Sequence, residues 1–255
     1  MSFVDSHCHI NFRELAENIT DVLAKMQQND VLNALCVSVN LADFPEVLAL
    51  ASQYPHIYAS VGVHPDYEQV EEPTVARLVA LAQHAKVVAI GETGLDYLRL
   101  TGDLEWQRER FRTHIRAARE CAKPLIIHTR NAAEATLRIM AEEGAADAGG
   151  VLHCFTESWE VAQQALDMGF YISFSGIITF KSALQIKAVA QRVPLDRMLI
   201  ETDSPYLAPV PFRGKLNQPG YVKHVAEEIA LLRGISVAEV GLRTSENFAR
   251  LFKLS

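Results

Sequence analysis

Short β-rich segments alternate with longer helical patterns along the whole chain. Runs of Val, Ile, Leu, Phe and Tyr bounded by turn residues predict eight strands, at 3–10, 33–39, 57–64, 86–92, 124–129, 149–155, 171–176 and 197–203. The clearest helix is predicted at 103–122, where apolar residues recur at helical spacing and Pro124 ends the pattern. Regular alternation of this kind is typical of α/β proteins with a parallel sheet.

The number of elements favours one closed barrel. Eight strands, seven helices between them and two helices after the last strand predict a TIM-type (β/α)8 barrel, and the 255 residues match its usual length. Because no Pro/Gly-rich linker, internal repeat or low-complexity segment interrupts the chain, we expect a single domain over 1–255. The alternative is a doubly wound open sheet, which would bind its ligand between two strands.

The charge balance limits the partners. The chain has 24 Lys and Arg residues against 31 Asp and Glu residues, a net charge of −7. This argues against a protein that covers long stretches of duplex DNA electrostatically, whereas a local phosphate site needs only a few cations or metal ions. The apolar runs are too short for a membrane span and the first residues lack the pattern of a signal peptide, so we expect no membrane association.

The four cysteines are scattered and form no CxxC pair: Cys8, Cys36, Cys121 and Cys154. We therefore expect reduced thiols in a cytoplasmic protein, with no disulfide framework. Cys8 and Cys154 each neighbour a histidine. Because adjacent strand residues point to opposite faces, we expect both thiols to point away from those histidines.

Polar residues stand near the carboxyl ends of most predicted strands. They are Asp5, His7 and His9 in the first strand, His64 in the third, Glu92 in the fourth, His128 in the fifth, His153 in the sixth, and Glu201 and Asp203 in the eighth. Active sites of barrels form at this end of the strands, so we expect these side chains around one opening. The remaining histidines are expected on the surface or on helix faces: His56, His84, His114 and His224.

This collection of imidazoles and carboxylates predicts a metal site. Buried carboxylates are costly unless they are paired with a positive charge or a metal ion. Nitrogen and oxygen ligands without a set of thiolates suit Zn²⁺, Mn²⁺ or Mg²⁺, and the set exceeds the four ligands of one tetrahedral ion. We therefore predict two divalent metal ions, with Glu92 as a bridge that holds them about 3.5–4 Å apart.

Several motifs, in their order along the chain, resemble the TatD family of metal-dependent hydrolases, often described as TatD-type deoxyribonucleases. The motifs are DSHCH (5–9), VGVHP (61–65), GETGLDY (91–97), KPLIIHTR (123–130), HCFTES (153–158), SGIITFK (175–181), ETDSPYLAP (201–209), RGKLNQP (213–219) and NFARLF (247–252). The resemblance covers essentially the whole chain. It implies a barrel of the metal-dependent hydrolase superfamily that uses divalent cations to hydrolyse phosphodiester bonds in DNA from a 3′ end.

The resemblance also implies which residues bind the metal ions. The implied ligands are His7, His9, Glu92, His128, His153 and Asp203. None of these positions is altered, but two others depart from the family pattern. Glu157 stands where the family has Gly, and Leu216 stands where it has Arg. An acid gained and a base lost both disfavour a polyanion, so hydrolase chemistry is a firmer expectation than the DNA substrate.

The expected catalytic roles follow from this site. We expect Asp203 to orient the attacking water and accept its proton, and Glu201 to hold a ligating histidine. His64 is expected to contact the scissile phosphate or to protonate the leaving group. Arg130, Arg213 and Lys215 are candidates for binding the flanking phosphates of single-stranded DNA. Tyr97, Phe155 and Tyr206 could stack on a base, although packing is the favoured role for them.

Two other functions use the same residues. One is an amide or ester hydrolase that deacylates a small molecule or an aminoacylated RNA. The other is a non-catalytic binding protein stabilised by metal. The loop 208–221 distinguishes the amide or ester hydrolase from a nuclease. If Arg213 and Lys215 point into the opening of the barrel, a phosphate substrate is favoured. If the loop closes an apolar pocket, an acyl substrate is favoured. For each function we expect a monomer.

Overall fold

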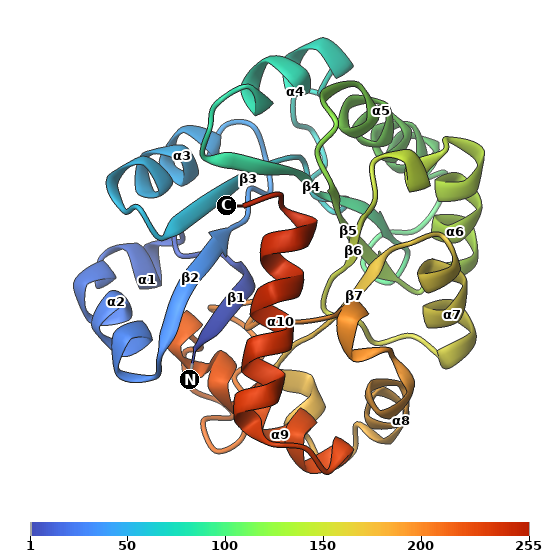
Figure 1. Cartoon of the computed structure of the whole chain (residues 1–255). Helices are drawn as coiled ribbons and strands as arrows, with labels where there is room; N and C mark the ends of the chain where they lie inside the picture. Colours follow the sequence, from blue (N-terminus) through green and yellow to red (C-terminus); the bar gives the residue numbers. More distant parts are fainter. Residues whose placement is uncertain (1, 255) are drawn as a thin grey trace.

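Eight strands follow one another around a ring, and each runs parallel to the next (Figure 1). The computed structural model describes residues 2–254, so residues 1 and 255, the limits of the expected domain, lie outside the described residues. The strands are β1 (Phe3–Cys8), β2 (Val31–Cys36), β3 (Ile57–Val61), β4 (Val87–Asp96), β5 (Leu125–Arg130), β6 (Gly150–Leu152), β7 (Tyr171–Phe174) and β8 (Met198–Ile200).

The ring closes between β1 and β8. Cys8 and Ser204 form a parallel bridge at this seam. The His9 N–H donates to the Ser204 carbonyl at 2.8 Å. The Asp203 N–H donates to the His7 carbonyl at 2.9 Å. The TIM-type (β/α)8 barrel is therefore confirmed, and the doubly wound open sheet is excluded.

Helices surround the ring and also cover one of its ends. They are α1 (Arg13–Ala16), α2 (Ile19–Gln28), α3 (Phe44–Gln53), α4 (Val75–Ala82), α5 (Glu105–Cys121), α6 (Ala133–Glu142), α7 (Trp159–Asp167), α8 (Leu184–Arg192), α9 (Val222–Arg233) and α10 (Val237–Leu251). Helix α5 matches the segment predicted at 103–122. It stops where Ala122 takes a left-handed conformation, with φ 53°. Within residues 2–254, no helix combines the length and the apolar character needed to cross a bilayer.

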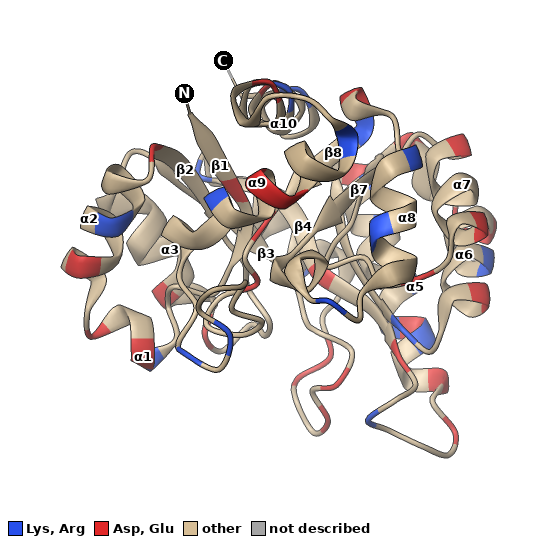
Figure 2. Ribbon diagram, turned by 90° about the horizontal axis from the view of Figure 1, so that it is seen from below, with Lys and Arg blue, Asp and Glu red and all other residues tan. Residues whose placement is uncertain are grey.

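Helix α10 lies across the amino-terminal ends of the strands, and the long loops project from the opposite end (Figures 1 and 2). Its Phe248 and Leu251, together with Phe252, pack against apolar residues inside the barrel such as Val4 and Leu199. A second apolar cluster fills the space between the strands and the surrounding helices. The amino end of the barrel is thus an apolar core, which leaves the carboxyl end for polar residues.

The strand ladder ends before several of the polar residues. Strands β6 and β8 end at Leu152 and Ile200, short of the predicted ends at 155 and 203. Beyond those ends the chain takes positive φ values, 43° at Cys154 and 54° at Asp203. Strand alternation no longer applies there, and Cys154 lines the same cavity as His153. The expectation that the Cys154 thiol points away from His153 stays a prediction.

His114 lies on a helix face, as expected, but it is completely buried. Its Nε2 accepts a hydrogen bond from the Val63 N–H at 3.0 Å, and its Nδ1 donates to the Arg110 carbonyl at 2.7 Å. His114 therefore ties α5 to the segment that directly precedes His64.

Candidate metal centre

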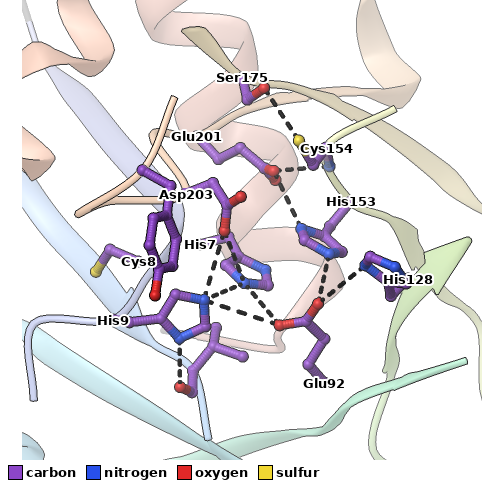
Figure 3. A network of polar contacts seen from close by, with 12 residues as sticks. His7, Cys8, His9, Glu92, His128, His153, Cys154, Ser175, Glu201 and Asp203 are labelled. Atoms are coloured by element: carbon purple, nitrogen blue, oxygen red, sulfur yellow. Dashed lines mark hydrogen bonds and ion pairs between the residues drawn. The ribbon is translucent and has the colours of Figure 1, made fainter. Parts of the chain in front are cut away.

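The carboxylate of Glu92 lies among five imidazole rings at the carboxyl end of the barrel. Figure 3 shows it with His7, His9, His128 and His153. Glu92 is buried, with 3% of its surface exposed. Its Oε1 lies 2.8 Å from His153 Nε2, 3.3 Å from His64 Nε2 and 3.3 Å from His128 Nδ1. Its Oε2 lies 3.2 Å from His7 Nε2 and 3.8 Å from His9 Nε2. The two oxygens of Glu92 therefore face two different groups of histidines.

Asp203 belongs to the group around Oε2. Its Oδ1 lies 3.4 Å from His9 Nε2 and 3.7 Å from His7 Nε2. The two Nε2 atoms of His7 and His9 are 3.2 Å apart. These histidines are two residues apart at the end of β1, so their side chains project to the same side of the strand.

The outer nitrogens of four rings are fixed by acceptors. His9 Nδ1 donates to the Val37 carbonyl at 3.0 Å. His153 Nδ1 donates to Glu201 Oε1 at 3.2 Å, and His128 Nε2 donates to Asp96 Oδ2 at 3.1 Å. The carboxylate of Asp66 holds His64 Nδ1 in the same way. In a neutral imidazole the other nitrogen then carries a lone pair, and in all four rings that nitrogen faces inward.

This arrangement fits bound metal ions. Inward lone pairs and carboxylate oxygens repel one another unless a proton or a cation lies between them. Among the described residues, His153 Nε2 has no hydrogen-bond partner although it is buried 2.8 Å from Glu92 Oε1. Three groups have ligand atoms within 4.8 Å of one another: His7, His153 and Asp203; His7, His9 and Glu92; and His64, Glu92 and His128. Nitrogen and oxygen donors of this kind suit Zn²⁺, Mn²⁺ or Mg²⁺.

The protein groups alone share protons unevenly. Burial would raise the pKa of Glu92, but the charges of His153, His64 and His7 hold it well below its usual range. The rings of His7 and His153 are stacked, with centroids 3.9 Å apart. Burial and the charge of His153 lower the pKa of His7. Burial also opposes charge on His153, yet the carboxylates of Glu92 and Glu201 raise its pKa well above normal. The pKa values of these two stacked rings are therefore shifted in opposite directions.

Glu201 is completely buried and supports His153 from behind. Its Oε1 accepts from both His153 Nδ1 and the Cys154 N–H, the latter at 2.7 Å. Because the backbone N–H follows His153 directly, Glu201 fixes both the ring and the chain that carries it. The Cys154 thiol contacts Ser175 Oγ at 3.2 Å (Figure 3).

Sequence reasoning missed Asp66 and Asp96, the carboxylates that hold His64 and His128 from outside the cage. Asp66 contacts His64 through one oxygen, and its Oδ2 lies 2.5 Å from Arg99 Nη1. Burial opposes charge on His64, but the charges of Glu92 and Asp66 raise its pKa to about 9. Asp66 stands two residues after a strand-end histidine and could have been proposed from that spacing. Arg99 lies on a loop, and no sequence signal connects it with this site.

A cavity of about 580 Å³ opens above the cage. It is lined by His9, Phe12, Val39, His64, Asp66, Tyr67, Glu92, Arg99, His128, Thr129, Arg130, His153, Cys154, Thr156, Ile177, Asp203, Tyr206 and Leu207. Arg130, a candidate for binding a flanking phosphate, therefore lines the cavity. Arg213 and Lys215 are exposed and do not line the cavity, and the Arg213 guanidinium lies over the ring of Phe180 at 4.3 Å.

Of the three aromatic residues named from the sequence, Tyr206 lines the cavity and Phe155 and Tyr97 do not. Tyr206 lines the cavity and is 57% exposed. Phe155 is buried in the apolar core, and Tyr97 packs against that core with its hydroxyl accepting from Arg108. Leu216 is 49% exposed, outside the cavity.

Comparison with known proteins gives a consistent result over the whole chain. Residues 4–253 match the family model described as TatD related DNase. The Escherichia coli (strain K12) protein named uncharacterized metal-dependent hydrolase YcfH is 49% identical, over 100% of this chain and 97% of that protein. The Salmonella typhimurium protein named 3′-5′ ssDNA/RNA exonuclease TatD is 32% identical, over 98% of each chain. The crystal structure of YJJV, a TatD homolog from Escherichia coli, has a TM-score of 0.92 at 28% identity and covers 99% of this chain and 98% of its own.

Proposed function

The chain belongs to the family of TatD-related DNases and is a metal-dependent hydrolase, and we propose that it removes nucleotides from the 3′ end of single-stranded DNA. The observation that carries this proposal is the position of Glu92, whose two oxygens face separate groups of histidines beneath an open cavity. A carboxylate placed in this way is suited to bridge two ions, the arrangement used in many phosphodiesterases. The name of the Salmonella relative supports the same activity and polarity.

Two divalent ions fit the residues present. His7, His9 and Asp203 would hold one ion together with Glu92 Oε2. His128 and His153 would hold the other together with Glu92 Oε1. When bound, such ions lower the pKa of water and neutralise charge that develops on a phosphate oxygen. Mg²⁺, Mn²⁺ and Zn²⁺ are all compatible with these donors.

The proposed proton transfers use two residues on opposite sides of Glu92. Asp203 orients the attacking water and accepts its proton as the oxygen bonds to phosphorus. His64 donates a proton to the leaving oxygen as the phosphorus–oxygen bond breaks, and Asp66 holds its ring toward the cavity. Glu201 acts indirectly, because it fixes the orientation of His153.

We assign flanking phosphates to Arg130, which lines the cavity. Arg213 and Lys215 remain candidates for phosphates of a longer strand that leaves the cavity, since both are exposed on the loop that follows the cavity-lining residues Tyr206 and Leu207. We also propose a cytoplasmic monomer. The four cysteines are free thiols, which supports a reducing compartment.

The test is a digestion of short single-stranded DNA labelled at its 5′ end. With Mg²⁺ or Mn²⁺ we expect a ladder of shortened strands that all retain the label, and EDTA should stop the reaction. Asp203→Asn should lower kcat by about 10²–10⁴-fold because it removes the proton acceptor. Asp196→Asn, which changes an exposed acid at the opposite end of β8, is the matched control and should cleave normally.

The same assay distinguishes the alternative function. Much of the cavity lining is apolar, including Val39, Ile177 and Leu207, which would also suit an acyl substrate. Intact DNA under every divalent metal, together with rapid hydrolysis of aryl esters or amides, would replace the nuclease by a metal-dependent amide or ester hydrolase.

A further inference from the structure

The cavity has two chemically different walls. Within residues 2–254, the Lys and Arg side chains that line it are Arg99 and Arg130, which lie just after β4 and at the end of β5. Its aromatic rings include the half-buried Phe12 and the exposed Tyr206, which follow β1 and β8. In a closed ring of eight strands, β4 and β5 lie opposite β8 and β1. A cationic wall therefore faces an aromatic wall across the metal cage.

The cationic wall offers an anion site. Arg99 is engaged by Asp66, with Nη1 and Oδ2 2.5 Å apart. Among the described residues, the Arg130 side chain makes no ion pair or hydrogen bond, although its carbonyl is fixed by the Tyr97 N–H at 2.9 Å. A guanidinium group that is anchored by its backbone and free at its head is suited to bind phosphate through two parallel hydrogen bonds.

The aromatic wall offers a flat surface. Tyr206 is 57% exposed, so its ring contributes little to the core. Its backbone is nevertheless held on both sides, because its N–H donates to the Asp203 carbonyl at 3.0 Å and its carbonyl accepts from Asn217 at 2.6 Å. Phe12 meets the Tyr206 ring edge-on at 6.3 Å between centroids and stacks on His9 at 5.0 Å. A rigidly mounted, exposed ring above a reactive centre is suited to stack on a planar ligand.

We infer that Tyr206, backed by Phe12, stacks on the base of the terminal nucleotide, while Arg130 binds the next phosphate along the strand. The inference rests on the proposed nuclease function and specifies its substrate. The scissile phosphate lies between the two walls, above Glu92. Stacking accepts every base, because each has a flat aromatic face, so recognition is independent of sequence and requires an unpaired end.

The two walls also determine which bond breaks. Asp203 is three residues from Tyr206 on the aromatic side, and His64 is joined to Arg99 through Asp66 on the cationic side. Water adds to phosphorus from the aromatic side and gives its proton to Asp203. The bond to the oxygen of the remaining strand breaks, and that oxygen takes a proton from His64. The released nucleotide keeps the phosphate, and the remaining strand ends in a free hydroxyl.

The first experiment varies the base. Short single strands with a normal 3′-terminal nucleotide are compared with strands whose last sugar lacks a base. Tyr206→Ala should raise KM for the normal end about tenfold or more and abolish the preference for a base. Tyr206→Phe keeps the ring and should retain the preference. If Tyr206→Ala affects normal and abasic ends equally, Tyr206 does not stack on the base.

The second experiment varies the phosphate. A dinucleoside monophosphate contains only the scissile phosphate, whereas a trinucleoside diphosphate contains the next one as well. Arg130→Ala should raise KM about tenfold for the longer substrate and leave the shorter one unchanged. Arg243→Ala, on α10 at the far end of the barrel, is the matched control. An equal loss on both substrates would overturn the role of Arg130.

Binding separates this inference from the proposed activity. Fluorescence anisotropy of a labelled single strand is measured with each variant in EDTA, where no hydrolysis occurs. A strand that binds through Tyr206 and Arg130 but is never cut, under any metal, would overturn the nuclease and support the inference. A strand that is cut and bound equally well by wild type, Tyr206→Ala and Arg130→Ala would overturn the inference and support the nuclease. A strand that is neither bound nor cut would overturn both.

Discussion

Glu92 separates two groups of imidazoles, and this division leads to a prediction about metal content. Each oxygen of Glu92 would serve one ion, so each ion depends on a different set of rings. We expect purified protein dialysed against Mn²⁺ or Zn²⁺ to hold two ions per chain by elemental analysis. His9→Ala and His128→Ala should each reduce the content to about one, and Glu92→Ala should remove both, since the bridge contributes to each site.

His64 provides the matched control for that measurement. It lies in one of the groups that could hold an ion, but we assign it to proton transfer. His64→Ala should therefore retain both ions while kcat falls. Loss of an ion in this variant would make His64 a ligand, and two ions in His9→Ala and His128→Ala would remove both from the ligand set.

His114 gives a prediction about stability and pH. Burial lowers its pKa from 6.5 to about 4 in the folded protein. The folded state thus binds fewer protons than the unfolded state between these values. The contribution of His114 to the free energy of unfolding is fully present above pH 6.5. It is lost as the pH drops toward 4, by about 3 kcal/mol in total. Denaturant unfolding of wild type and His114→Gln at several pH values should show that the variant lacks this part of the loss.

The comparison isolates His114 because carboxylates titrate equally in both proteins. His84→Gln, which changes an exposed histidine, controls for the loss of one imidazole. Parallel curves for wild type and His114→Gln between pH 7 and 4 would show that His114 is accessible to protons in the folded state.

The convergence of polar residues could be predicted from strand ends, but their supporting partners could not. His7, His9, Glu92, His128 and His153 come from the ends of four strands, β1, β4, β5 and β6, and a barrel brings such ends together. Asp66 and Arg99 lie on loops, where no periodicity fixes side-chain direction. The burial of His114 could not be predicted either, because a helical pattern does not show which neighbouring residue a polar side chain contacts.

Among the elements, β4 depends on a glycine. Gly94 pairs with His128 in the ladder between β4 and β5. A Cβ at this position would lie 1.9 Å from the His128 carbonyl oxygen, and its φ of +134° is rarely adopted by other residues. We expect Gly94→Ala to destabilise the fold by about 3 kcal/mol or more and to lower metal affinity, because the clash forces β5 and His128 away.

Gly102→Ala is the control for conformation alone. Gly102 also has a positive φ, +100°, but a Cβ there meets no atom within 4 Å. Its substitution should cost about 1–2 kcal/mol at most and leave metal binding unchanged. Equal losses for the two variants, measured by denaturant unfolding, would show that the contact with His128 is unimportant.

The existence and order of the elements followed from the sequence, whereas their ends did not. The predicted strands continued past Leu152 and Ile200, to 155 and 203, whereas the ladder ends at those two residues and the chain then takes positive φ values at Cys154 and Asp203. The loop 208–221 was the least predictable segment. Its conformation depends on contacts such as that between Arg213 and Phe180, and it leaves Arg213 and Lys215 outside the cavity.

At the scale of the whole molecule, the cage joins strands that close the barrel. His7 lies in β1 and His9 directly after it, Asp203 follows β8, and Glu92 comes from β4 on the opposite side of the ring. The seam itself is held by few backbone hydrogen bonds together with the buried carboxylate of Asp5, which accepts from Thr202 N–H at 2.9 Å and from its hydroxyl at 2.6 Å. Ion binding therefore links β1 and β8, the two sides of the seam, to β4 on the opposite side of the ring. It requires the folded barrel.

Metal binding should consequently stabilise the entire fold, because an ion that binds only the native state shifts the unfolding equilibrium. At about 100 times the dissociation constant the gain is about 2.7 kcal/mol. For a chain of this length that corresponds to an increase in Tm of about 5–10 °C when Mn²⁺ or Zn²⁺ is added to EDTA-treated protein. Calorimetry should show one transition that moves as a whole, and Glu92→Gln should show a much smaller shift. If the Tm of the wild type does not change when metal is added, or if Glu92→Gln shows an equal increase in Tm, the ions do not bind at the seam.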